Sequence, residues 1–89
     1  MTTKPKVLHR NSIGVPRDAV YVGRPTKWGN PYLIGRDGTR KAVIWKYQLW
    51  LEGNEDLLAA LPELRGKTLT CWCAPRACHA DILLEKSND

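Results

Sequence analysis

Four side chains that could bind a metal or carry out nucleophilic chemistry lie within nine residues near the C-terminal end of the chain. They are Cys71, Cys73, Cys78 and His79, which include every cysteine of the chain and one of its two histidines. Thiolates and imidazole are ligands that zinc prefers, and four of them complete a tetrahedral site. We therefore predict a Zn²⁺ cofactor here, although the Cys-x-Cys spacing is tighter than usual and adjacent ligands at 78 and 79 diverge at a helix start.

Two other interpretations of the same cluster stay open. Cys78 could be a catalytic nucleophile, because a helix N-terminus, Arg76 and His79 would all favour its thiolate; the general base would then be His79 or His9. Alternatively, the cysteines are small apolar residues on the inner face of a central strand and His79 is a satisfied helix cap. Trp72 alternates with the cysteines, so it is expected on the opposite strand face and in the core.

A second candidate site is the segment over residues 23–32, which combines cations, aromatic rings and glycines. Arginine and lysine side chains bind phosphate, aromatic faces stack on bases, and glycines let a ligand approach the backbone. The predicted ligand-binding residues are Arg24, Lys27, Trp28, Asn30 and Tyr32. The alternative is that Trp28 fills the core, residues 29–31 form a turn and the two cations are solvated.

Both segments carry the resemblance of this chain to a known family. The motifs are Gly-Arg-x-x-Lys-Trp-Gly-Asn-Pro, at residues 23–31, and Cys-Trp-Cys-x-Pro-x-x-Cys-His, at residues 71–79. They resemble those of a bacterial and bacteriophage domain-of-unknown-function family, number 4326, over about residues 20–84. The chain departs from the family pattern at Ala80, where glycine is usual. The resemblance implies a phage or bacterial source and implies no activity.

The elements that must position these segments follow from hydrophobic periodicity and turn residues. Strands are predicted over 6–9, 19–22 and 67–73, and helices over 39–53, 54–61 and 78–86. This order, β-β-α-α-β-α, predicts a small single α/β domain of about three strands with helices packed on the sheet, spanning 7–89 after a basic tail over 1–6. In such folds, sites gather where strands lead into helices.

The longest predicted helix, over 39–53, is apolar around more than half of its girth. One stripe contains Val43, Tyr47, Trp50 and Leu51, and a neighbouring stripe contains Ala42, Trp45 and Leu49. We therefore expect this helix to be well buried. Thr39 is the predicted N-cap and Gly53 the predicted residue that follows the helix end. Asn54 is the predicted N-cap of the next helix, which Pro62 ends or kinks.

Charge and composition restrict the partners of the chain. The net charge is +5, with ten Lys and Arg against two Asp in residues 1–46 and four against seven acidic residues in the remainder. This asymmetry favours a nucleotide or nucleic acid as partner. No apolar run approaches the ~18 residues of a membrane span, and no secretory leader is visible, so we expect no membrane partner and a cytoplasmic protein, in the host cytoplasm if it is phage-encoded.

These observations support three hypotheses of function. The first is a small domain, a monomer or weak dimer, that binds a nucleotide or nucleic-acid phosphate through the 23–31 segment beside the Cys/His cluster. The second is a thiol- or metal-dependent enzyme acting on a nucleotide-like substrate in the same pocket. The third is a phage protein that docks on a host protein through exposed tryptophans.

Overall fold

The chain forms a small parallel sheet with its helices packed below it. The computed structural model describes residues 5–74 and 76–88. Within them the sheet consists of β1 (Val7–His9), β2 (Val20–Tyr21) and β3 (Leu69–Cys71). The strand order is β1-β3-β2, and β3 runs parallel to both neighbours. The last strand of the sequence is therefore the central strand of the sheet.

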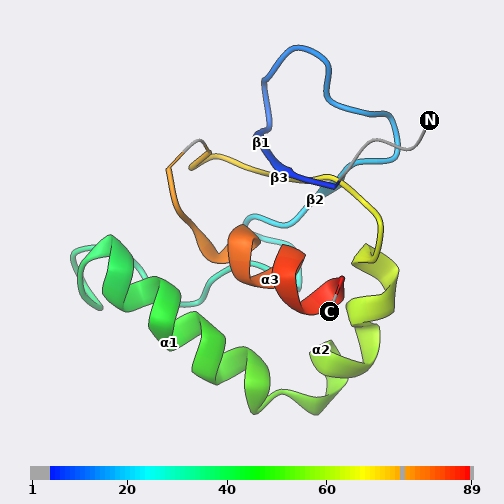
Figure 1. Cartoon of the computed structure of the whole chain (residues 1–89). Helices are drawn as coiled ribbons and strands as arrows, with labels where there is room; N and C mark the ends of the chain where they lie inside the picture. Colours follow the sequence, from blue (N-terminus) through cyan, green and yellow to red (C-terminus); the bar gives the residue numbers. More distant parts are fainter. Residues whose placement is uncertain (1–4, 75, 89) are drawn as a thin grey trace.

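The helices follow the predicted order. They are α1 (Arg40–Glu52), α2 (Glu55–Ala60), a 3₁₀ helix over Leu61–Leu64 and α3 (His79–Ser87). Helix α3 contacts β1 and β3 on one side and α1 and the 3₁₀ helix on the other, so it lies between the sheet and the remaining helices (Figure 1). This arrangement confirms a mixed α/β domain of three strands and three α-helices.

Local signals fix the ends of the helices. The Thr39 hydroxyl accepts the Ala42 N–H at 3.2 Å, and the Asn54 amide oxygen accepts the Leu57 N–H at 3.2 Å, so both predicted N-caps are confirmed. Gly53 ends α1, but with φ −92°, so the end of α1 does not need the left-handed conformation that favours glycine. Pro62 lies in the 3₁₀ helix, where α2 has already ended.

The core lies between α1, α3 and the sheet. Fully buried side chains come from these three, from the 3₁₀ helix and from the residue that follows β2: Val22, Tyr47, Leu51, Leu64, Leu69, Cys71 and Leu83. The prediction that α1 is buried around most of its girth is wrong, since Trp45 is 61% and Leu49 is 49% exposed. Helices α2 and α3 contact one side of α1 and leave the stripe with Trp45 and Leu49 facing outward.

The third predicted strand, over 67–73, is shorter than expected. Strand β3 ends at Cys71 and its three residues are buried, so Cys73 lies beyond the regular strand and in the following loop. Trp72 is 55% exposed, which corrects the expectation that it belongs to the core. In the described part of the chain, no helix has both the length and the apolar character needed to cross a membrane.

Candidate functional site

The carboxyl ends of the three parallel strands meet at one edge of the sheet. His9 pairs with Cys71 in register, and the backbone N–H groups of Arg10 and Val22 donate to the carbonyl oxygens of Cys71 and Thr70 at 2.8 and 3.0 Å. The segments that leave this edge are therefore held side by side. Parallel sheets commonly bind ligands at this edge, because strand ends and the helices that follow them converge there.

A cavity of about 150 Å³ lies at this edge. Its walls come from the segment after β2, from α1 and from the segment between β3 and α3. The lining residues are Tyr21, Gly23, Arg24, Asn30, Tyr32, Ile34, Arg40, Val43, Ile44, Cys71, Trp72, Cys73, Ala77, Cys78 and His79. Both segments that the sequence singled out thus contribute to one cavity, although about forty residues separate them.

The cysteines at the cavity are organised around one pair. The sulfurs of Cys71, the last residue of β3, and Cys78, the N-cap residue of α3, lie 3.1 Å apart. Cys71 and Cys78 are buried, Cys73 is half-buried, and none of the three forms a disulfide. The contact between Cys71 and Cys78 is a hydrogen bond in which one thiol donates to the other sulfur.

The surroundings of the pair distinguish the two sulfurs. A hydrogen bond from Cys78 and the backbone N–H groups of Cys73 and Ala74 lower the pKa of the Cys71 thiol to about 6, against the opposing effect of burial. The pKa of the Cys78 thiol is raised, because it holds its proton toward Cys71 and because it is buried. The directions of these two shifts favour Cys71 as the more acidic thiol of the pair, whereas the sequence had favoured Cys78.

His79 is engaged in the core. Its Nε2 lies 2.7 Å from the carbonyl oxygen of Val22, and its ring lies edge-on to the ring of Tyr47 at 4.9 Å between centroids. A carbonyl oxygen only accepts, so Nε2 carries the proton. Burial lowers the pKa of His79, which keeps the ring neutral. No hydrogen bond between the His79 ring and the Cys78 sulfur is found among the described contacts, so the structure does not pair the two catalytic candidates.

The predicted zinc ligands share the cavity without forming a ligand cage. Within residues 5–74 and 76–88, no group of three or more His, Cys, Asp or Glu side chains is placed to hold a metal ion. Two thiolates bound at ~2.3 Å to one tetrahedral zinc lie about 3.8 Å apart, farther than the 3.1 Å between Cys71 and Cys78. His79 also directs Nε2 at Val22. The distances favour a hydrogen-bonded thiol pair, and zinc stays a prediction.

The segment after β2 folds back on itself and directs Arg24 to the cavity. The Thr26 N–H donates to the Gly23 carbonyl and the Gly29 N–H to the Thr26 carbonyl, each at 3.0 Å. A Cβ at position 29 would lie 3.0 Å from Cα of Arg24, so glycine permits this close turn. Gly29 thus serves the packing of the segment on itself, whereas Gly23 leaves room for the Tyr21 side chain of β2.

The same turn carries two of the predicted ligand-binding residues away from the cavity. Lys27 forms an exposed ion pair with Glu63 at 3.0 Å. Trp28 is 3% exposed, and its carbonyl oxygen accepts the Tyr47 hydroxyl at 2.7 Å, which ties the segment to α1. Neither Lys27 nor Trp28 lines the cavity, whereas Arg24, Asn30 and Tyr32 do. For Trp28 the packing alternative describes the observed position.

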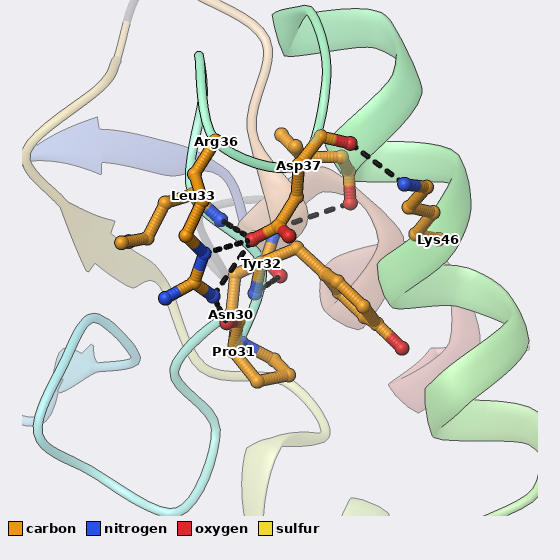
Figure 2. A network of polar contacts seen from close by, with 8 residues as sticks. Asn30, Pro31, Tyr32, Leu33, Arg36, Asp37 and Lys46 are labelled. Atoms are coloured by element: carbon orange, nitrogen blue, oxygen red, sulfur yellow. Dashed lines mark hydrogen bonds and ion pairs between the residues drawn. The ribbon is translucent and has the colours of Figure 1, made fainter.

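A polar network holds the wall formed by residues 30–38 (Figure 2). The buried Asn30 amide donates to the Val43 carbonyl of α1 at 3.2 Å and accepts the Tyr32 N–H at 2.9 Å. Asp37 accepts the Leu33 N–H at 2.8 Å and pairs with Arg36, which lowers the pKa of its carboxyl group. Lys46 of α1 donates to the Asp37 carbonyl at 2.7 Å. Asn30 therefore positions Tyr32, and its own amide atoms are already used.

Sequence reasoning missed several residues of this edge. Arg40, in the first turn of α1, donates to the Ala77 carbonyl at 3.1 Å and lines the cavity. The Arg10 guanidinium lies 4.4 Å from the ring centroid of Tyr21 and 5.6 Å from that of Trp72. The sequence could have indicated Tyr21 as a site residue, because it lies at the end of a predicted strand and sites gather at strand ends. Nothing local in the sequence places Arg40 or Arg10 beside it.

Comparisons with known proteins give relatives of uncharacterised function. The chain is 36% identical over 64 residues to "Uncharacterized protein R718" of Acanthamoeba polyphaga mimivirus, covering 61% of the chain and 48% of the relative. It is 38% identical over 69 residues to "Uncharacterized 12.4 kDa protein in nrdA-td intergenic region" of Enterobacteria phage T4, covering 72% of the chain and 62% of the relative. The chain thus spans about half to three fifths of the length of these relatives.

No solved structure matches the chain. A family model, in contrast, matches residues 6–89, nearly the whole chain and more than the stretch that carried the resemblance. This match confirms the family recognised from the two motifs: the chain belongs to the family described as Domain of unknown function (DUF4326).

Proposed function

We propose that the cavity at the carboxyl edge of the sheet binds a nucleotide, with its phosphate at Arg24 and Arg40. The observation that carries this proposal is the charge of the lining. Two guanidinium groups line the cavity, and no carboxylate stands among the lining residues of the described chain. Neither arginine forms a salt bridge with a carboxylate of the described residues. Guanidinium groups free of an acidic partner favour a phosphate, which they bind with two parallel hydrogen bonds.

The aromatic residues of the lining support binding of the base of the nucleotide. Tyr21, Tyr32 and Trp72 line the cavity, and Trp72 is largely exposed. Exposed aromatic faces stack on bases, which is a sequence-tolerant way to hold a nucleotide. The volume of about 150 Å³ is below the ~300–1,000 Å³ of typical small-molecule sites. A cavity of this size can hold part of one nucleotide. That nucleotide is either a free mononucleotide or one unit of a single-stranded nucleic acid.

Binding is tested by calorimetric titration with a nucleoside 5′-monophosphate, the matching nucleoside and inorganic phosphate. We expect the monophosphate to bind and the nucleoside to bind about tenfold more weakly or worse, since a charge-assisted contact contributes about 1.5–3 kcal/mol. Binding should also weaken with salt. A short single-stranded oligonucleotide is the second arm. Tighter binding of the oligonucleotide than of the monophosphate identifies nucleic acid as the source of the nucleotide.

A matched pair of variants locates the phosphate. Arg24→Gln should weaken binding of the monophosphate about tenfold, whereas Lys27→Gln, which removes one positive charge from the same segment outside the cavity, should leave it unchanged. The Lys27–Glu63 pair is exposed, so its loss costs ~0–1 kcal/mol of stability. Equal losses in the two variants would mean that net charge alone attracts the ligand, and they would contradict the proposed site.

A second candidate function is a thiol-dependent enzyme on a nucleotide-like substrate, with Cys71 as the nucleophile. It is favoured by the position of the acidic Cys71 thiol in the cavity lining. Cys71→Ala should then abolish turnover of the nucleotide substrate and keep nucleotide binding. A Cys71→Ala variant that turns over substrate as fast as the original chain would contradict it.

A further inference from the structure

Cys71 and Cys78 are brought together by the tertiary structure in a way that suits chemistry between them. One residue ends the central strand and the other precedes α3, and their sulfurs lie 3.1 Å apart. Cys73 lies between them in sequence but has no such sulfur contact among the described residues. The pair lines a cavity that opens at the sheet edge, so a small molecule can approach it although both side chains are buried.

The contact between the two sulfurs suits thiol exchange in either order. Backbone N–H groups of Cys73 and Ala74 contact the Cys71 sulfur, and that of Ala80 contacts the Cys78 sulfur, so the protein can stabilise a thiolate at either position. The other sulfur then lies within contact distance for a second attack. A disulfide has an S–S distance of ~2.05 Å, so the sulfurs must approach by about 1 Å. The described residues of the loop that joins β3 to α3 have no regular secondary structure.

We propose that Cys71 and Cys78 form a redox-active pair that is oxidised to an intramolecular disulfide by low-molecular-weight disulfides such as glutathione disulfide. One sulfur of the pair attacks, as the thiolate, one sulfur of the small disulfide, forms a mixed disulfide and releases one small thiolate. The other protein sulfur then attacks the protein sulfur of the mixed disulfide, a second small thiolate leaves, and the proton of the attacking thiol passes to one of the two released thiolates. The two protein sulfurs lose two electrons, and the small disulfide is reduced to one thiol and one thiolate.

The lining of the cavity selects the class of oxidant. Arg24 and Arg40 stand at the cavity with no carboxylate among its described lining residues, so a disulfide that carries carboxylates, as glutathione disulfide does, is attracted. A neutral or cationic small disulfide lacks this attraction. This inference does not require nucleotide binding, and its test measures only the covalent state of the cysteines.

The experiment exposes the reduced full chain to glutathione disulfide, blocks remaining thiols with an alkylating agent and identifies the products by mass spectrometry. Cleavage by trypsin after Lys67, Arg76 and Lys86 places Cys71 and Cys73 on one peptide and Cys78 on another. We expect a disulfide-linked peptide pair in the original chain and, at the same rate, in Cys73→Ser. A peptide with an internal Cys71–Cys73 disulfide, or loss of the linked pair in Cys73→Ser, would overturn the proposal.

Two further variants test the mixed-disulfide step. Cys78→Ser should accumulate one glutathione on Cys71, and Cys71→Ser should accumulate one on Cys78, because each variant lacks the sulfur that resolves the mixed disulfide. Absence of a stable mixed disulfide from both variants would overturn the proposal. The proposal would also be overturned if the purified protein held one zinc per chain and glutathione disulfide oxidised the cysteines only after a chelator was added.

The charge selection has its own measurement, made on the original chain and on Arg24→Gln. Cystamine, a cationic disulfide, should oxidise the pair more slowly than glutathione disulfide at low salt, and Arg24→Gln should reduce that difference. A different result would be that glutathione disulfide oxidises Arg24→Gln as fast as the original chain while this variant no longer binds the nucleoside monophosphate. That result would support the redox pair and contradict the selection of the oxidant by Arg24. If the disulfide-linked peptide pair does not form while the nucleoside monophosphate still binds, the redox proposal is overturned and the proposed nucleotide binding is not.

Discussion

At the scale of single residues, Cys71 and His79 show how burial and hydrogen bonding set the protonation of neighbouring groups in opposite ways. Cys71 accepts hydrogen bonds from Cys78 and from two backbone N–H groups, so its charged form is stabilised despite burial. His79 donates from Nε2 to the Val22 carbonyl and is buried, so its neutral form is stabilised. The site therefore combines a thiol whose pKa is lowered with a buried imidazole whose pKa is also lowered.

The acidity of Cys71 predicts how fast it is alkylated at each pH. Its rate should reach half of its maximum near pH 6, in place of the ~8.5 of an ordinary cysteine. Cys78→Ala should raise this midpoint, because the hydrogen-bond donor is lost, and Cys78→Ser should restore part of the shift through its hydroxyl. The measurement is the alkylation rate of the Cys71 peptide by mass spectrometry. Identical midpoints in the original chain and Cys78→Ala would contradict the paired arrangement.

His79 predicts a pH dependence of stability. Because its pKa is lowered in the folded chain, the unfolded chain binds more protons from the lowered folded value up to 6.5. This contribution to stability is fully present above pH 6.5 and is lost as the pH falls through the folded pKa. The measurement is the urea midpoint at several pH values for the original chain and His79→Gln.

His79→Gln serves as the control because an amide N–H can still donate to Val22 and does not titrate. The difference between the two proteins gives the contribution of His79 to the pH dependence of the urea midpoint. Cys71 contributes equally to both proteins, and its lowered pKa affects stability mainly at higher pH. We expect a shallower decline of the urea midpoint below pH 6.5 in His79→Gln. Parallel curves for the two proteins would be inconsistent with a buried neutral His79.

At the scale of elements, the cavity wall over residues 30–38 is held by hydrogen bonds to α1 more than by regular structure (Figure 2). Asn30 and Lys46 join the wall to the helix, at the Val43 carbonyl and the Asp37 carbonyl respectively. The helix itself begins at the Thr39 cap, directly after this wall. Positioning of Tyr32 therefore depends on α1 being formed.

Asn30→Ala should lower the free energy of unfolding by about 1–3 kcal/mol, because it leaves the Tyr32 N–H without its acceptor and removes a buried amide. Asn11→Ala is the matched control, since the Asn11 side chain is exposed and makes no hydrogen bond among the described residues; its effect should stay within about 0.5 kcal/mol. Urea denaturation measures both. Equal effects of the two substitutions would contradict the tethering role of Asn30.

At the scale of the whole molecule, the strand order decides where the site forms. Because β3 lies between β1 and β2 and all three run parallel, the chain leaves the same edge three times, carrying Arg10, Arg24 and Trp72 with it. Helix α3 then returns along the sheet and packs against α1, which places Cys78 beside Cys71 (Figure 1). The central strand supports both the core and the cavity.

This position predicts a large effect of truncating the central strand. Leu69→Ala, at a fully buried residue of β3, should cost about 2–5 kcal/mol and lower Tm by roughly 10 °C or more, since 1 kcal/mol shifts Tm by ~4–8 °C in domains of this size. Leu49→Ala, which removes the same side chain from the outward face of α1, should change stability by about 0.5 kcal/mol or less. Thermal unfolding compares the two. A similar loss in both would contradict the described packing of the core.

The hypothesis of docking on a host protein also belongs to this scale. Trp45 and Leu49 stand exposed on the outward face of α1, and Trp72 is exposed at the sheet edge. The exposed tryptophans that the hypothesis needs are present on two different faces. Which of them contacts a partner stays a prediction for binding experiments with the Trp45→Ala and Trp72→Ala variants.

Sequence alone determined the features that depend on neighbours along the chain. Helix caps at Thr39 and Asn54 and the order of elements were predicted correctly, because capping and periodicity act over a few residues. The family was recognised from the resemblance of two contiguous motifs, which the match of the family model confirms. The motif segments were also recognised, and both reach the cavity. Local pattern could not tell which residues of a motif point inward, so Lys27 and Trp28 were grouped with Arg24.

Only the tertiary structure decided the chemistry of the site. The exposure of Trp72, the burial of His79 against Val22 and the arrival of Arg40 from α1 follow from which elements pack together, at separations of tens of residues. The same holds for Cys71, because its acidity depends on a sulfur seven positions away and on backbone groups whose direction the loop sets. Spacing in the sequence restricts which side chains can meet, but packing of the sheet and helices selects those that do, because only packing fixes burial and distance.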